Sequence, residues 1–146
     1  VTASLFFNWD NTEKTDLKDL IPTFKLDDLI KEKVNAKNTF ILMDIENSEY
    51  KSLLGSSSIL SSKNKPIWMV EVHPTFYSKA SRPLKEFDDI FNIFWRNQYS
   101  SYLVAESGLI KIDENNYKNI LDSEEKHNHN YLFIDINKVE NFKYLF

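Results

Sequence analysis

Two short apolar runs dominate the pattern of hydrophobic positions along the chain. Residues 39–45 (TFILMDI) and 67–72 (IWMVEV) are nearly continuous apolar stretches, which is typical of strands buried on both faces of a parallel sheet. Between them, the apolar positions of residues 48–62 fit one face of a short helix. Pro66 and Pro74 flank the second run at positions where a strand can begin and must end. We therefore predict a strand–helix–strand unit whose two strands are parallel and joined by a right-handed crossover.

The strongest helical pattern lies further along the chain. Apolar side chains recur there at three- and four-residue spacing, at Leu84, Phe87, Ile90, Phe91, Phe94 and Trp95. This period predicts a helix that packs against a sheet.

Shorter patterns follow this helix. Residues 101–105 and 109–112 predict two short strands, separated by a Glu-Ser-Gly turn. Residues 131–136 (YLFIDI) predict a late strand. The polar stretch 113–130 predicts a helix or loop on the surface.

The first third of the chain has weaker patterns. Residues 3–7 are a candidate strand, and we expect a helix with its N-cap near Asp27 or Asp28. No repeat or low-complexity linker divides the chain. We therefore expect one α/β domain over residues 1–146.

Composition narrows the classes of function. Hydrophobic residues make up 42% of the chain and aromatic residues 14%, which is enough for a folded core. The net charge of -4 gives no broad positive field, which disfavours binding to nucleic acid or an anionic membrane. The absence of cysteine excludes disulfides and thiolate metal sites. The chain has neither a membrane-spanning apolar run nor a signal-peptide start, so we expect a soluble, cytoplasmic protein. The sequence leaves its oligomeric state open.

Ionisable side chains gather where the two buried-type strands end. The first strand leads into Asp44, Glu46 and Glu49, and the second leads into Glu71 and His73. Residues two apart on a strand share a face, so each strand presents its ionisable side chains together. Ligands of parallel sheets bind beyond the carboxyl ends of the strands. Acids and a histidine that converge there would repel or shift in pKa unless a ligand, metal or proton used them, which predicts a functional site.

Several of the candidate residues also have simpler explanations. An acid at a strand end often caps the next helix, and Glu46 or Asn47 fits that role. His127 and His129 have a spacing that suits a weak metal site, but without a third ligand nearby a polar surface loop is favoured. Trp9 either lines a substrate pocket or covers the sheet edge.

Four motifs occur along the chain in a characteristic order and spacing. They are LDDL at residues 26–29, DIENSE at 44–49, LLG at 53–55 and, after Pro66, EVHP at 71–74. Together they resemble the FkbM family of S-adenosylmethionine-dependent methyltransferases. That family has a Leu-Asp-Asp-Leu start, an apolar strand ending in Asp-x-Glu-Gly-Ala-Glu, a helix reaching Leu-x-Gly, and a proline-led strand ending in Glu-x-His-Pro.

The resemblance implies a fold, a cofactor and residue roles. The fold would be the later strands of a Rossmann-like class I methyltransferase sheet, mostly parallel, with room for an antiparallel edge. The donor would be S-adenosyl-L-methionine, and the small-molecule or glycan acceptor would be methylated on a hydroxyl. Asp44 would bind the cofactor near its reactive methyl, and His73 or Asp44 would act as base unless either bound a divalent cation instead. Asp44, Glu71 and His73 are thus the expected catalytic residues. The residues expected to bind the acceptor are Glu46, Glu49, Glu71, His73 and Trp9.

The sequence departs from the family pattern on the cofactor side. Asn47 and Ser48 replace the small Gly-Ala pair of the family motif. The only two glycines are Gly55, at a predicted helix end, and Gly108, in a predicted turn, so they cannot form a glycine-rich cofactor loop. The chain also begins with Val1 and not with methionine. We therefore expect a C-terminal fragment of such an enzyme, inactive by itself.

Two other classes of function fit the sequence less well. One is a noncatalytic α/β module that binds a partner through an aromatic-rich surface near Trp9 and Trp95. The other is a metal-dependent phosphoesterase with Asp44, Glu46 and Glu71 as oxygen ligands.

Overall fold

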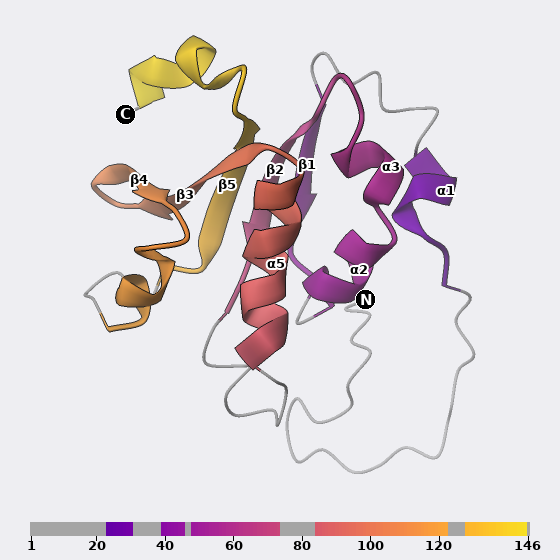
Figure 1. The fold of residues 1–146 in the computed structure, drawn as a ribbon, viewed down its shortest axis with the longest axis horizontal. Coiled ribbons are helices and arrows are strands. Elements are labelled where there is room, and N and C mark those ends of the chain that lie inside the picture. Colours follow the sequence, from indigo (N-terminus) through magenta and orange to yellow (C-terminus); the bar gives the residue numbers. More distant parts are fainter. Residues whose placement is uncertain (1–22, 31–38, 46–47, 74–83, 123–127, 146) are drawn as a thin grey trace.

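The computed structural model describes residues 23–30, 39–45, 48–73, 84–122 and 128–145 (Figure 1). The helices are α1 (Leu26–Ile30), α2 (Glu49–Leu54), α3 (Ser57–Leu60) and α5 (Leu84–Arg96), with 3-10 helices η1 (Tyr117–Asp122) and η3 (Val139–Leu145). The strands are β1 (Phe40–Met43), β2 (Ile67–Glu71), β3 (Tyr99–Ala105), β4 (Gly108–Ile112) and β5 (Asn130–Asp135). Each strand expected within the described residues is present, and helical structure occurs wherever a helix is predicted there, which confirms the α/β class. The candidate strand at residues 3–7 lies outside them.

The strands form one mixed five-stranded sheet in the order β1-β2-β5-β3-β4 (Figure 1). The pair β1–β2 is parallel, as the strand–helix–strand pattern predicts. The pairs β2–β5, β5–β3 and β3–β4 are antiparallel, so the expectation of a mostly parallel sheet is wrong. Two features cause this. The two-residue turn between β3 and β4 is too short for a crossover, and β5 enters between β2 and β3 in the opposite direction to both.

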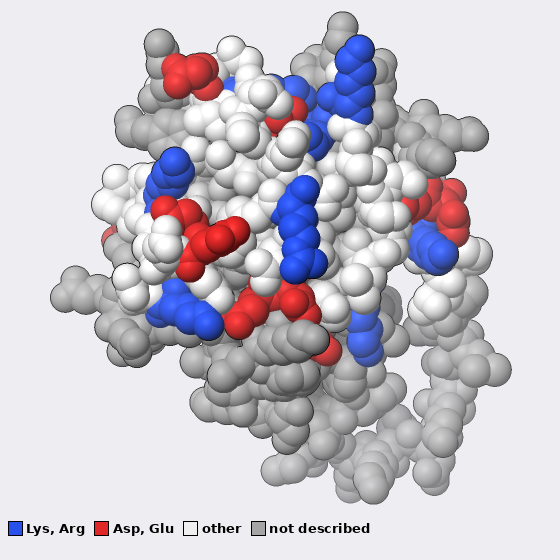
Figure 2. Space-filling view, in the orientation of Figure 1, with Lys and Arg blue, Asp and Glu red and all other residues white. Residues whose placement is uncertain are grey.

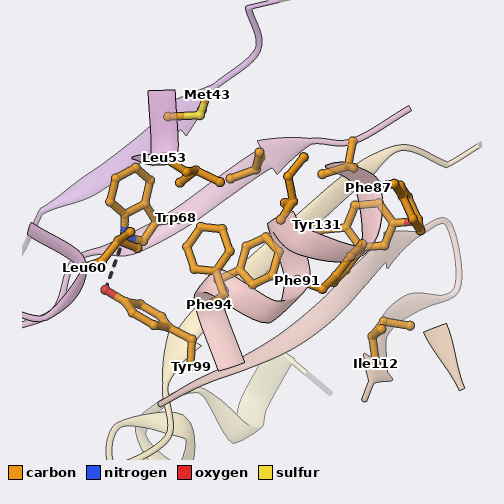
Figure 3. Packing of buried hydrophobic residues seen from close by; sticks show 14 of the residues in the cluster. Met43, Leu53, Leu60, Trp68, Phe87, Phe91, Phe94, Tyr99, Ile112 and Tyr131 are labelled. Carbon is orange, nitrogen blue, oxygen red and sulfur yellow. Dashed lines mark hydrogen bonds between the residues drawn. The ribbon is translucent and has the colours of Figure 1, made fainter. Parts of the chain in front are cut away.

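Helix α5 covers one face of the sheet and forms the centre of the core (Figures 1 and 3). Phe94 is fully buried, and its ring stacks on that of Phe133 from β5 with centroids 3.7 Å apart. The indole N–H of Trp68 on β2 donates a hydrogen bond of 3.3 Å to the hydroxyl of Tyr99 on β3. Burial of one such side chain stabilises the fold by about 1.5–3 kcal/mol. Burial also raises the pKa of Tyr99 far above its ordinary value, although the Trp68 hydrogen bond opposes the shift.

The two faces of the sheet are distinguished by strict alternation along each strand. On β2, Trp68 and Val70 join the core beneath α5, whereas Ile67 and Met69 pack into a second cluster. The buried residues of the second cluster are Tyr102, Leu132 and Ile134, with Val139 and Phe142 of η3 packed against them. On β1 the same alternation leaves Phe40 and Leu42 exposed, at 53% and 62%. The described residues therefore cover the face beneath α5 more completely than the opposite face, where Phe40 and Leu42 stay exposed.

The helical segment between β1 and β2 differs from the single predicted helix over residues 48–62. It consists of α2 and α3, and Gly55 and Ser56 separate them. The expected cap position near Asp27 is also different. Asp27 lies inside α1, and its carboxylate accepts hydrogen bonds from the backbone N–H groups of Ser58 (2.9 Å) and Ile59 (3.0 Å). Asp27 therefore caps the first turn of α3, about thirty residues away in sequence.

The β3–β4 hairpin is tied to α5 by a short chain of polar contacts. The indole N–H of Trp95 donates to the hydroxyl of Ser101 at 2.8 Å, and Ser101 donates to the carbonyl oxygen of Ile112 at 3.0 Å.

Gly108 has a φ of 121° in the hairpin turn, a conformation that favours glycine. The described helices are all too short or too polar to cross a membrane.

Candidate active site

The carboxyl ends of β1 and β2 meet at one edge of the sheet, as predicted. The two strands are in register with Met43 opposite Val70, and both residues are buried in the core cluster that also includes residues of α5. The next residues along the chain are Asp44 and Glu71, which therefore fall side by side. Because side chains alternate, this pair belongs to the face that carries Phe40 and Met69, opposite to α5.

The candidate acids differ in their exposure. Asp44 is exposed directly after β1, and Glu71 is half-buried as the last residue of β2. Glu46 lies outside the described residues, as does Trp9. The structure thus brings Asp44 and Glu71 to one end of the sheet, while the roles of the other two residues stay predictions.

Glu49 has a structural contact that the sequence did not predict. It lies in the first turn of α2 with only 2% of its surface exposed. Its Oε1 atom accepts a hydrogen bond of 3.1 Å from the backbone N–H of Ile45. The carboxylate therefore fixes the turn that follows β1, next to Asp44. Its assignment to acceptor binding stays a prediction.

The histidine of the EVHP motif has a partner from the other end of the sequence. The ring centroids of His73 and His129 are 3.6 Å apart, with an angle of 35° between the rings. The backbone N–H of Val72 donates a hydrogen bond of 2.7 Å to the carbonyl oxygen of His129, which extends the β2–β5 pairing beyond Glu71. His129 therefore lies in a half-buried loop position directly before β5, in contact with His73. His127 lies outside the described residues.

Further acidic groups lie where α2 faces the first turns of α5. Burial raises the pKa of Tyr50 on α2, and the nearby carboxylates of Asp89 and Glu86 raise it further. Elsewhere on the face that carries α5, acidic and basic side chains are interspersed among uncharged ones (Figure 2). A concentration of acids is therefore a local property of this end of the sheet.

The structure describes only some of the residues on which the alternative functions depend, because Glu46 and Trp9 lie outside the described ranges. Within the described ranges, no three acidic or histidine side chains are grouped so that they could hold a metal ion. Trp95, proposed as part of a partner surface, is half-buried against the rings of Phe91 and Tyr117. With its indole N–H donated to Ser101, this tryptophan is a packing residue.

The described residues suit the positively charged sulfur of a sulfonium cofactor, but their glycines do not form a loop that could hold the rest of it. Carboxylates at the strand ends suit a positively charged sulfur, because opposite charges attract most strongly where water is partly excluded. The two glycines serve other purposes. Gly55 ends α2, where a Cβ atom would come within 3.3 Å of the Lys25 Cα atom, and Gly108 forms the hairpin turn. Neither glycine contributes to a cofactor loop.

These features define an α/β protein with acidic and imidazole groups at the carboxyl ends of adjacent parallel strands. The chain matches the methyltransferase FkbM domain over residues 7–101, which is more than half of its 146 residues. It belongs to the FkbM methyltransferase family. The matched region extends from before α1 to the beginning of β3 and includes Asp44, Glu71 and His73. No curated protein and no solved structure matches the chain.

The contact of His129 with His73 is what the sequence failed to indicate. His129 lies beyond the region matched by the family, and its spacing from His127 suggested only a weak metal site or a polar surface loop. Its proximity to His73 depends on β5 pairing with β2, two strands that are about sixty residues apart. The one available signal is its position immediately before the predicted strand at residues 131–136.

Proposed function

We propose that this chain forms the acceptor side of an S-adenosylmethionine-dependent O-methyltransferase that acts on a hydroxyl of a sugar or small metabolite. The observation that carries the proposal is the FkbM match over β1 and β2, whose carboxyl ends bring Asp44 and Glu71 together. We further propose that the sheet is the later part of a Rossmann-like class I arrangement. The parallel pair β1–β2 supports this assignment, since ligands of such sheets bind beyond the carboxyl ends of their strands.

The chemistry of methyl transfer assigns a role to each side chain at this edge. S-adenosylmethionine would supply a methyl group activated by a positively charged sulfur. Asp44, exposed at the end of β1, would attract that charge and orient the donor. Glu71, half-buried beside it, would accept a hydrogen bond from the acceptor hydroxyl and align its oxygen for in-line attack. His73 would take the hydroxyl proton as general base.

Isothermal titration calorimetry with S-adenosylmethionine tests the proposal on the natural full-length protein. We expect saturable binding, and an affinity about tenfold weaker for Asp44→Asn, which corresponds to about 1.4 kcal/mol. Asp113→Asn is the matched control, because Asp113 is an exposed acid after β4, away from the parallel strands. The proposal fails if the natural protein binds no S-adenosylmethionine.

The type of acceptor atom needs a separate experiment. Transfer of a labelled methyl group from S-adenosylmethionine to a panel of simple sugars and polyols would be followed by mass spectrometry. We expect the label in an O-methyl ether, with turnover reduced about 10²- to 10⁴-fold in His73→Gln, as is usual for the loss of a general base. Label found exclusively on nitrogen would contradict O-methylation.

A further inference from the structure

The two imidazoles at the end of the sheet come from strands that are remote in sequence. His73 lies two residues after the end of β2, whereas His129 directly precedes β5. Their ring centroids are 3.6 Å apart and their ring planes are tilted by 35°, so the two rings are in direct contact. Both residues are half-buried. The contact therefore joins the family motif to a residue outside the matched region.

The strand geometry explains why the rings meet only beyond the sheet. In the β2–β5 ladder Glu71 is opposite Asn130, and the Val72–His129 hydrogen bond adds one further step. Alternation along β5 assigns His129 to the face of Tyr131, beneath α5, whereas His73 shares the opposite face with Glu71. Side chains on opposite faces do not touch within a sheet. Their rings approach beyond the Val72–His129 hydrogen bond, after the regular β2–β5 ladder has ended.

We propose that His129 is a positioning residue for His73, and that the two contacting imidazoles act as one proton-holding unit on the acceptor side of the site. This inference rests on the function proposed above. Contact with the tilted His129 ring restricts rotation of the His73 ring, which keeps a ring nitrogen directed to one place. Two positive charges this close repel each other strongly, so the unit holds one proton readily and a second only with difficulty.

Charged and titratable groups from several elements lie towards this end of the sheet. They are Asp44 after β1, Glu49, Tyr50 and Lys51 on α2, Glu71 on β2, Glu86, Asp88 and Asp89 on α5, Glu106 after β3, and Tyr117 and Lys118 of η1 beside Asp88. Acids outnumber lysines in this set, and an acidic neighbour favours a positive charge on an imidazole. Asn128 and Asn130, on either side of His129, are uncharged.

Such a unit suits removal of a proton from a hydroxyl. The neutral imidazole takes the hydroxyl proton while the new O–CH₃ bond forms and the S–CH₃ bond of the donor breaks. The sulfur is left as a neutral thioether, so charge and atoms balance. Repulsion from a protonated neighbour keeps one imidazole available as base over a wider range of pH than a single histidine would be.

Histidine titration followed by NMR tests this inference. The chain has three histidines, so His127→Asn leaves only His73 and His129. In that protein we expect the two imidazole Cε1–H signals to titrate in two steps separated by more than about one pH unit. After a further His129→Gln or His73→Gln substitution, the remaining histidine should titrate in one step, at higher pH than the lower of the two original steps.

A third variant separates the packing role from the proton coupling. His129→Phe keeps an aromatic ring against His73 but cannot hold a proton. The ring-current shift of His73 should persist, while its titration becomes a single step. If the lower step of the His127→Asn protein has the same midpoint as either single-histidine variant, the two imidazoles titrate independently and the inference is overturned.

The link to the methyltransferase site has its own measurement in the natural full-length protein. S-adenosylmethionine should move the titration of the pair to lower pH than S-adenosylhomocysteine does, because only the former carries a positive sulfur. If the two compounds shift the titration equally, His73 and His129 do not sense the charged sulfur and are not part of the methyltransferase site. Proton coupling without any S-adenosylmethionine binding would overturn the proposed function, whereas binding without coupling would overturn this inference alone.

Discussion

Substitution of Asp27 by alanine tests whether α1 holds α3 in place through a single carboxylate. Asp27 accepts hydrogen bonds from two backbone N–H groups, those of Ser58 and Ile59, and a weaker one of 3.3 Å from the hydroxyl of Ser57. Replacing an N-cap acid by alanine costs about 0.5–2 kcal/mol, and the partly exposed Asp27 serves two N–H groups. We expect Asp27→Ala to lower the free energy of unfolding by about 1–2 kcal/mol. The melting temperature should fall by about 2–8 °C.

The assay is urea denaturation followed by circular dichroism, with Asp28→Ala as the matched control. Asp28 is the exposed next residue of α1, so its substitution changes charge and helix propensity in the same way. We expect the control to lie within about 0.5 kcal/mol of the original protein. Equal free energies of unfolding for the two variants would refute the bracing role of Asp27.

The same contact predicts a dependence on pH. Burial alone would raise the pKa of Asp27, but the hydrogen bonds from Ser58 and Ile59 outweigh it and hold the pKa below 3.8. An acid whose pKa is lower in the folded state stabilises the fold above its unfolded pKa and loses that contribution as pH falls through the folded value. The difference between Asp27→Ala and the original protein should therefore be constant near neutral pH and shrink below about pH 4. A difference that is unchanged at pH 2 would contradict this explanation.

Three further measurements address other contacts. Ser101→Ala removes the hydroxyl that receives the Trp95 N–H, and denaturation should show a loss of about 1–3 kcal/mol. Glu49→Ala should cost a similar amount, and Glu49→Gln less, because an amide oxygen can still accept the N–H of Ile45; equal losses would argue against that bond. Burial raises the pKa of Tyr131 to about 12, so the free energy of unfolding should decrease between pH 10 and 12, and by less in Tyr131→Phe.

Local patterns predicted the elements well because their causes are local. The continuous apolar runs of β1 and β2 and the three- and four-residue period of α5 reflect which faces are buried, and burial fixes the type of element. Strand direction depends instead on which strands become neighbours. The sequence indicated one crossover and one turn correctly, but nothing local indicated that β5 would enter between β2 and β3. The predicted parallel majority failed for that reason.

The same distinction applies to the candidate site, where some contacts could be predicted from local patterns and others depend on the complete fold. Asp44 and Glu71 could be paired from sequence because a single crossover relates their strands. The capping role of Asp27 and the contact between His73 and His129 could not, because each joins segments whose approach depends on the complete fold. A carboxylate before a helix and a histidine in a polar stretch have many local explanations. The tertiary contact selects among them.

The position of β5 also has a consequence for how the chain folds during synthesis. Among the described strands β5 is the last in the sequence, yet it lies in the middle of their order and pairs with both β2 and β3. Until it emerges from the ribosome, the nascent chain holds two separate pairs, β1–β2 and β3–β4, each with an unpaired apolar edge. Unpaired edges of this kind can pair with other chains and cause aggregation, and chaperones bind such surfaces during folding. Residues 130–135 therefore close the sheet and end that exposure in one step.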